Sequence, residues 1–205
     1  MATYLDRILE AQARFVDAVG ATRAGLALFG ITLPSDPEAI SREIGAGIGR
    51  MQAHLASRSP EDLLQLPTLT DPDKRMAMDL LFQSIPSAIQ TFPPLFILAE
   101  LIMFDLAVEH GLSPASAKNF VDCGIIQGGI LGDYERAYRL GKAAFQVLDR
   151  FGAKAIASSV NFVFATYVSS WRAGPEEALA AFDDCYRLGM ETGDLQHMGF
   201  GTALR

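Results

Sequence analysis

The sequence predicts an all-α fold, and three patterns carry that prediction. Proline follows a capping residue at five places, and such a pair is a typical helix start because proline is favoured at the first helical position. These pairs are Asp36-Pro37, Ser59-Pro60, Asp71-Pro72, Ser113-Pro114 and Gly174-Pro175. Between them apolar residues recur every three or four positions, and no stretch alternates strictly as a strand would. Glycine stands where these stretches end, as a left-handed C-terminal cap requires.

The glycines also predict a repeat. Gly30, Gly111, Gly152 and Gly193 each follow an apolar-periodic stretch, and the last three are 41 residues apart. The same offset aligns Phe104 with Phe145 and Tyr186, Leu106 with Val147 and Leu188, and the small residues Ala117, Ser158 and Gly199. A two-helix unit of this length is typical of α-solenoids, so we expect a right-handed solenoid of hairpins like those of tetratricopeptide (TPR) repeats.

Each expected element follows from these signals. Helices are expected at about 4–29 and 37–57, with a short one at 60–66. Hairpins are expected at 72–111, 113–152 and 154–193, with a partial unit at 194–205. The hairpin at 72–111 is expected to be interrupted by Pro86 and by the stretch 91–94, because proline removes a backbone donor. The other two are expected to turn at Gly132-Asp133 and at residues 173–175.

These elements predict one continuous domain. Residues 1–71 would form its N-terminal helices and residues 72–205 its hairpin repeats. The last stretch, LQHMGFGTALR, does not have the polar outer face that a solenoid needs in a terminal cap. We therefore expect the sequence to be a piece of a longer protein.

Composition excludes several classes of protein. The 205 residues are 50% hydrophobic and 20% charged, which is typical of a folded globular chain. Seventeen Lys and Arg against 24 Asp and Glu give a net charge of -7 with no basic run, so no nucleic-acid partner is expected. The longest uncharged run, 80–99, contains three prolines and several polar residues, so no membrane span is expected. The first residues lack the pattern of a signal peptide, which predicts a cytoplasmic location.

Several strings resemble a known family. They are GLALFGITLPSDP (25–37), EDLLQLPTLTDPDKRMAMDLL (61–81), VEHGLSPASA (108–117), GGILGDYERAYRLGKAAFQVLDRFGAK (128–154) and RLGMETGDLQHMGFG (187–201). In order and spacing they resemble a TPR-like helical region of very large bacterial signalling proteins. In that family an AAA-type ATPase module, often preceded by a Ser/Thr kinase domain, comes before the region, and GAF and sensor histidine kinase domains commonly follow it. The resemblance implies those flanking domains as partners within the same polypeptide.

No residues in the chain form a recognisable catalytic or cofactor-binding motif. The Gly-rich stretch 45–49 lacks the spacing of a phosphate loop and suits close helix packing. His54, His110 and His197 lie far apart, and Cys123 and Cys185 lack the spacing of metal ligands. We therefore expect no enzymatic activity, no cofactor and no metal in this segment.

Four residues are candidates for binding a partner or ligand. In TPR-like solenoids the first helices of the hairpins line the concave face, where extended ligands bind. On those helices the sequence places Asn119, Asn161, Tyr167 and Trp171 in otherwise apolar surroundings. Aromatic and amide side chains suit the recognition of peptides or small ligands. In the other interpretation, both aromatic residues belong to the core and both amides bond to neighbouring turns.

These observations predict a non-catalytic interaction or regulatory scaffold segment of a multidomain ATPase/kinase signalling protein. One alternative is a sensor domain that binds a small ligand or peptide on its concave face. A second alternative is a homodimerisation module, which the high apolar content also allows.

Overall fold

The computed structural model describes residues 2–205, and these residues form helices and no β-strand. The all-α prediction is therefore confirmed for the described chain. In order, the elements are α1 (Ala2–Ala11), α2 (Phe15–Ala27), α3 (Pro37–Ser57), η1 (Asp62–Gln65), α4 (Pro72–Thr91), α5 (Pro93–His110), α6 (Ala115–Ile125), η2 (Ile126–Ile130), α7 (Tyr134–Phe151), α8 (Lys154–Val163), η3 (Phe164–Val168), η4 (Ser169–Trp171), α9 (Pro175–Thr192) and α10 (Leu195–Leu204). The elements η1 and η4 are 3₁₀ turns, and η2 and η3 are π turns.

Three of the five predicted proline-based helix starts are present in the structure, whereas Pro60 lies in a turn before η1 and Pro114 precedes the first residue of α6. Helices begin at Pro37, Pro72 and Pro175, each at the first or second helical position. The Asp71 side chain accepts hydrogen bonds from the backbone N–H groups of Asp73 and Lys74, so it satisfies two donors at the open end of α4. At the start of α3 the Asp36 carboxylate accepts from the Ala39 N–H at 2.8 Å.

Contacts divide the described chain into two compact units. Unit 1 contains residues up to 57 together with 67–111, and unit 2 contains residues 58–66 and 112–205. The prediction of one continuous solenoid domain stays a prediction.

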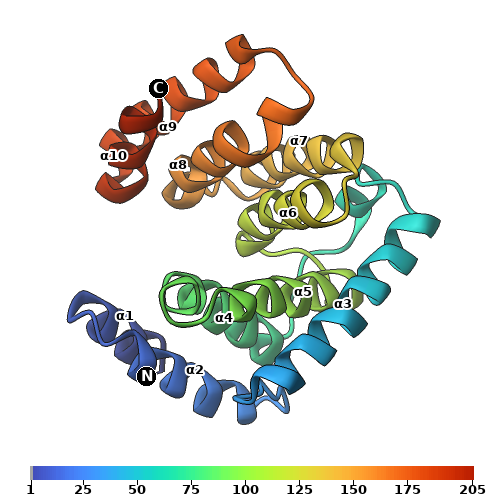
Figure 1. Cartoon of the computed structure of the whole chain (residues 1–205), viewed down its shortest axis with the longest axis vertical. Helices are drawn as coiled ribbons and strands as arrows, with labels where there is room; N and C mark the ends of the chain where they lie inside the picture. Colours follow the sequence, from blue (N-terminus) through green and yellow to red (C-terminus); the bar gives the residue numbers. More distant parts are fainter. Residues whose placement is uncertain (1) are drawn as a thin grey trace. The chain divides into compact units, whose positions relative to one another are not determined.

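In unit 1 the helices α4 and α5 lie side by side, α2 packs on α4, and α3 packs on α5 (Figure 1). Gly47 of the Gly-rich stretch lies against Leu101, where a Cβ atom would come within 3.1 Å of the leucine Cβ. Close packing is thus confirmed at Gly47, whereas Gly45 and Gly49 face open space. Arg50 of α3 also pairs with Asp105 of α5 at 2.8 Å.

Two predictions for unit 1 are wrong. The helix expected at 4–29 is broken, because Ala13 adopts a positive φ of 56° and the chain folds back so that α1 packs on both α2 and α4. The contact includes a hydrogen bond of 2.6 Å from the Ser87 hydroxyl to Glu10. The second is the interruption at Pro86, because α4 continues through it. The break predicted at 91–94 is confirmed at Phe92, which is extended because it precedes Pro93.

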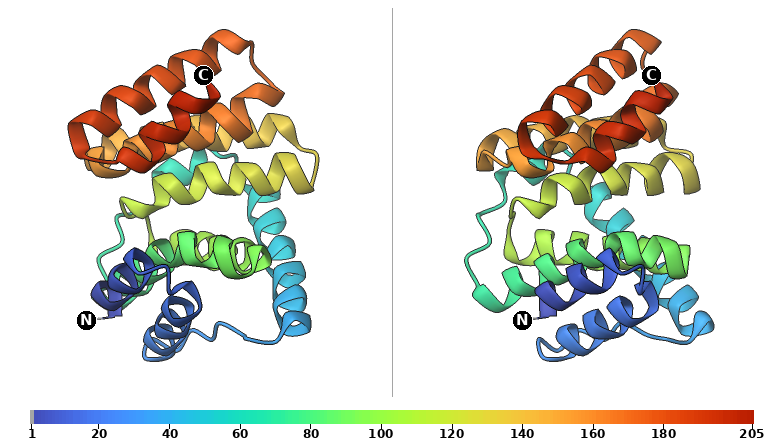
Figure 2. Two further views of the ribbon diagram at one scale, coloured as in Figure 1. Left: turned by 60° about the vertical axis from the view of Figure 1, so that its left-hand side comes forward. Right: turned by 90° about the vertical axis from the view of Figure 1, so that its left-hand side faces the viewer.

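Unit 2 contains the hairpins α6–α7 and α8–α9, followed by α10. Figure 2 shows α9 and α10 side by side, and both also contact α8. The expected turn at Gly132-Asp133 lies between η2 and α7, where the Asp133 carboxylate caps the helix by accepting from the Arg136 N–H. The small-residue alignment holds for Ala117 and Ser158, which are buried, but is wrong for Gly199, which is exposed.

The 41-residue offset recurs in the helix bounds. Pro93, Tyr134 and Pro175 begin α5, α7 and α9, which are 18 residues long and start at this spacing. Lys154 and Leu195 begin α8 and α10, which are 10 residues long and are separated by the same offset.

A strap, residues 58–66, belongs to unit 2 although it precedes α4 in the sequence. The Glu61 carboxylate of the strap accepts two hydrogen bonds from the Arg139 guanidinium of α7, one from Nε and one from a terminal nitrogen. Arg150 donates to the backbone carbonyls of Leu64 and Leu66, and Leu63 is fully buried. Two arginines of α7 therefore hold the strap in place.

Candidate functional site

The two predicted asparagines are buried. Asn119 in α6 and Asn161 in α8 are both at least nine-tenths covered. The Asn161 amide donates to the Ala157 carbonyl at 2.9 Å, and the Asn119 amide lies 3.7 Å from the Cys123 sulfur. Each amide therefore bonds one turn away along its own helix, as the core interpretation predicted.

The two predicted aromatic residues are exposed and belong to different groups of rings. Tyr167 of η3 meets Phe162 edge-on, with ring centroids 6.4 Å apart. Trp171 of η4 packs on Tyr134 of α7, with centroids 5.5 Å apart, and covers Gly128 so closely that no side chain fits there. The four predicted residues therefore do not form one site.

Tyr167 belongs to an aromatic cluster that we define as Phe162, Tyr167, His197 and Phe200. Phe162 lies at the centre, 5.7 Å from the ring centroid of His197 and 5.8 Å from that of Phe200. Tyr167 and Phe200 are exposed, and the other two side chains are half-buried. The cluster joins α8 and η3 to α10.

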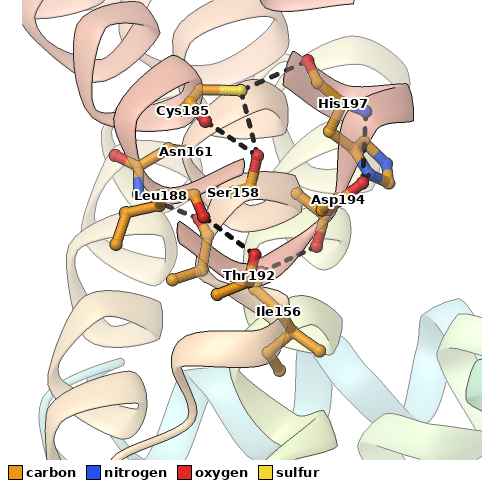
Figure 3. Close-up of polar contacts among 10 residues, drawn as sticks. Ile156, Ser158, Asn161, Cys185, Leu188, Thr192, Asp194 and His197 are labelled. Carbon is orange, nitrogen blue, oxygen red and sulfur yellow. Dashed lines mark hydrogen bonds and ion pairs between the residues drawn. The ribbon is translucent and has the colours of Figure 1, made fainter. Parts of the chain in front are cut away.

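Beside the cluster, polar side chains connect α8, α9 and α10 (Figure 3). The Ser158 hydroxyl donates to the Cys185 carbonyl at 2.9 Å, and the Cys185 thiol donates to the His197 backbone carbonyl at 3.3 Å. The His197 ring nitrogen Nδ1 lies 2.9 Å from the Asp194 carboxylate, which also accepts from the His197 N–H.

This polar group contains residue types found in cysteine and serine hydrolases, but its geometry is that of a packing junction. The hydrogen bond of Cys185 with His197 goes to the backbone carbonyl, so it does not pair the thiol with the imidazole as nucleophile and base. Burial raises the pKa of the Cys185 thiol, although the hydrogen bond with Ser158 opposes that shift. A buried, protonated thiol is a poor nucleophile.

Glycines allow the helices to approach closely at this junction. A Cβ atom on Gly189 would come within 2.7 Å of the Met198 Cβ and 2.9 Å of the Asp194 carbonyl oxygen. A Cβ atom on Gly201 would lie 3.0 Å from the Cys185 sulfur. The position of α10, and with it that of the aromatic cluster, therefore depends on these two glycines.

We expect Asp194→Ala to lower the free energy of unfolding by about 1 kcal/mol, because it removes the N-cap of α10. Burial raises the pKa of Asp194, but the hydrogen bonds and charge of His197 outweigh it and hold that pKa below its ordinary value. The ionised carboxylate therefore stabilises the fold at neutral pH, and this contribution is lost as pH falls through the lowered pKa. Urea denaturation at neutral and acid pH measures both effects.

Asp194→Asn is the matched control, since asparagine caps helices as well as aspartate does. It should cost less stability at neutral pH than Asp194→Ala. Equal losses in the two variants would contradict the capping role.

Two further results concern the described residues as a whole, and a third concerns the sequence. No helix in residues 2–205 combines the length and apolar character needed to cross a bilayer. No group of three or more His, Cys, Asp and Glu side chains in the described chain is placed to hold a metal ion. Comparison of the sequence with protein-family models, with curated proteins and with solved structures gives no match.

Proposed function

We propose that this chain is a non-catalytic interaction scaffold, built as a right-handed stack of TPR-like hairpins. The recurrence of helix bounds at 41 residues supports the repeat, because equal helices at equal spacing are what a stack of equivalent hairpins requires. In the signalling proteins that the sequence resembles, such a segment would lie between nucleotide-dependent domains and sensor domains of one cytoplasmic polypeptide.

The observation that carries the proposal is the aromatic cluster. Tyr167 of η3 and Phe200 of α10 expose large rings, and Phe162 contacts both of them. Exposed aromatic residues that pack on neighbouring side chains are typical of the few positions that supply most of the binding energy in protein interfaces. The cluster therefore suits a protein or peptide partner.

A small ligand fits the cluster less well. Pockets for small molecules bury most of the ligand surface, whereas Tyr167 and Phe200 are open to solvent. Native mass spectrometry of the purified chain separates the two functions, because a small ligand that survives purification adds mass in the native spectrum alone.

The mechanism we propose is a change in the spacing of helices when a partner binds. A partner that bridges Tyr167 on η3 and Phe200 on α10 contacts two hairpin units at once, so it favours one spacing of α8 and α10 over others. A ligand can shift such an equilibrium by as much as its affinity differs between the two arrangements. Domains on either side of the segment would respond to that shift.

We expect the double variant Tyr167→Ala/Phe200→Ala to reduce signalling by the intact protein roughly tenfold or more, since two interface anchors are lost. Deletion of residues 72–193 should abolish signalling. Thermal denaturation should show a fold close to that of the unaltered protein for the double variant, because both side chains are exposed.

Leu28→Ala serves as the control, because Leu28 is an exposed apolar residue of unit 1 outside the cluster. Unchanged signalling after deletion of residues 72–193 would overturn the scaffold function. If the double variant behaved like Leu28→Ala, the cluster would not be the binding site.

A further inference from the structure

Tyr134 and Trp171 form an exposed aromatic pair outside the aromatic cluster. Tyr134 begins α7 and Trp171 ends η4, and both belong to unit 2. Their ring centroids lie 5.5 Å apart, and the ring planes are tilted by 57°. The exposed fractions of the two residues are 47% and 38%. The pair therefore presents two aromatic surfaces to solvent at one place.

The π turn η2 holds the indole of Trp171 in place. Gly128 lies so close to the indole ring that it leaves no room for a Cβ atom, and a Cβ atom on Gly129 would lie 3.4 Å from the same ring. The residue after each ring also pairs, because the Arg172 guanidinium donates to the Glu135 carboxylate. The pair is thus ordered before a partner arrives, which lowers the entropic cost of binding.

The repeat shows that this edge stays open when another hairpin follows. Tyr134 is exposed although the hairpin α8–α9 comes after it, and Pro175, which begins the equivalent helix α9, is also exposed. At the 41-residue offset Trp171 corresponds to Ile130, which is 51% exposed with the next hairpin in place. Exposure near these hairpin turns is therefore a property of the repeat.

The charged side chains beside the pair neutralise one another. Glu135 pairs with Arg172, and each follows one of the two aromatic residues in the sequence. Asp133, which precedes α7, pairs with Arg136 at 3.1 Å. A charged ligand would have to break one of these ion pairs to gain a new one. The pair therefore suits an uncharged segment better than an acidic or a basic one.

Both rings carry a hydrogen-bond donor that is open to a ligand. Among the described residues, no group accepts a hydrogen bond from the Trp171 Nε1–H or from the Tyr134 hydroxyl. Proline has a carbonyl acceptor but no N–H, so a proline-rich segment supplies acceptors and needs few in return. Its rings pack on aromatic surfaces, and its polyproline II helix is formed before binding.

We propose that the Tyr134–Trp171 pair binds an uncharged, proline-rich segment of a partner protein in the polyproline II conformation. The proline rings pack on the two aromatic rings, and backbone carbonyls of the segment accept from the indole N–H and the phenol hydroxyl. This site is separate from the aromatic cluster, so the proposal goes beyond the proposed function and does not rest on it.

Trp171 is the single tryptophan of the chain, so its fluorescence reports on the site directly. Titration of the full chain with decaproline should shift the tryptophan emission to shorter wavelength with saturation. Tyr134→Ala should weaken the binding roughly tenfold or more, as expected for an anchor residue. Trp171→Phe keeps a ring but removes the donor, so it should weaken the binding of labelled decaproline, measured by anisotropy, roughly fivefold.

Tyr186→Ala is the matched control. Tyr186 of α9 is exposed to nearly the same extent as Tyr134, at 46%, but it is not a member of the pair. This variant should bind decaproline as the unaltered chain does. A Gly-Ser peptide of equal length lacks proline rings and should not bind. Added salt should leave the binding of decaproline unchanged, because no charge takes part in it.

Other outcomes overturn the proposal. Equal binding by Tyr134→Ala and Tyr186→Ala would place the peptide elsewhere, and equal binding of the Gly-Ser peptide would exclude recognition of proline. An unchanged emission spectrum, together with no binding in calorimetry, would exclude the site altogether. If signalling still depended on Tyr167 and Phe200 in that case, the docking proposal would fail while the scaffold function stood.

Discussion

Gly111→Ala should lower the free energy of unfolding by about 3 to 5 kcal/mol, one of the two largest single-residue effects that we expect. Gly111 ends α5 with φ 110° and ψ 173°, a conformation open almost only to glycine. A Cβ atom there would also lie 2.5 Å from the Pro67 carbonyl oxygen and 3.0 Å from the Leu69 nitrogen. Both neighbours are backbone atoms, so they cannot move aside as a flexible side chain would.

Thermal denaturation followed by circular dichroism measures this effect, and a fall of about 10 °C in the midpoint is expected for a chain of this size. Gly30→Ala is the matched control, since Gly30 has φ 74° but nothing within 4 Å of an added Cβ atom. It should cost only about 1 kcal/mol of backbone strain. Equal losses in the two variants would contradict the role of the Pro67 contact.

Phe164→Ala should destabilise the protein by about 3 to 5 kcal/mol, the usual cost of removing a buried phenylalanine. The ring is enclosed by Tyr138, Phe145 and the Lys142 side chain, and it lies so close to Gly141 that a Cβ atom there would come within 2.7 Å. Since these groups fix each other's positions, the cavity left by alanine cannot close without moving α7. Urea denaturation of the variant and the unaltered chain gives the difference.

Phe200→Ala provides the comparison within the same unit. Phe200 is aromatic and contacts Phe162, but half of its side chain is exposed, so the loss should stay below about 1 kcal/mol. A loss as large as that of Phe164→Ala would mean that the aromatic cluster stabilises unit 2 as much as the α7–η3 contact does.

Local sequence signals predicted the backbone at several places where one residue type determines it. Pro37, Pro72 and Pro175 begin helices in the structure because proline already has the helical φ. Gly152 and Gly193 end helices in the left-handed conformation, as their positions in the sequence indicated. These features need no information from distant parts of the chain.

The predicted helix bounds were wrong where contacts between helices determine the backbone. The chain between Gln12 and Arg14 has no proline, and α1 leaves α2 there in order to pack on α4. Pro86 carries a strong helix-breaking signal, yet α4 continues through it. In both places contacts between helices outweigh local preference, and no window of sequence contains those contacts.

The candidate site was predicted only in part for a related reason. Tyr167 and Trp171 are exposed in the structure, and their binding role stays a prediction, but the sequence did not identify Phe162, His197 and Phe200 as companions of Tyr167. The π turn η3 shifts the helical register, so residues five apart, Phe162 and Tyr167, come together instead of those three or four apart. For Asn119 and Asn161 the sequence left both interpretations open, because a polar residue in an apolar helix can bond to its own helix as readily as to a ligand, and in the structure both amides bond to their own helices.

The long distance in sequence between the strap and α7 affects how the chain folds during its synthesis. Arg139 follows Glu61 by 78 residues, and a ribosome adding about 5 to 20 residues each second needs about 4 to 16 s to cover that distance. During this interval all of unit 1, which ends at residue 111, can leave the ribosome and fold, while Leu63 has no core to enter. The nascent strap, whose Leu63 is buried only in the complete fold, is thus an unpaired loop on a finished unit until α7 emerges.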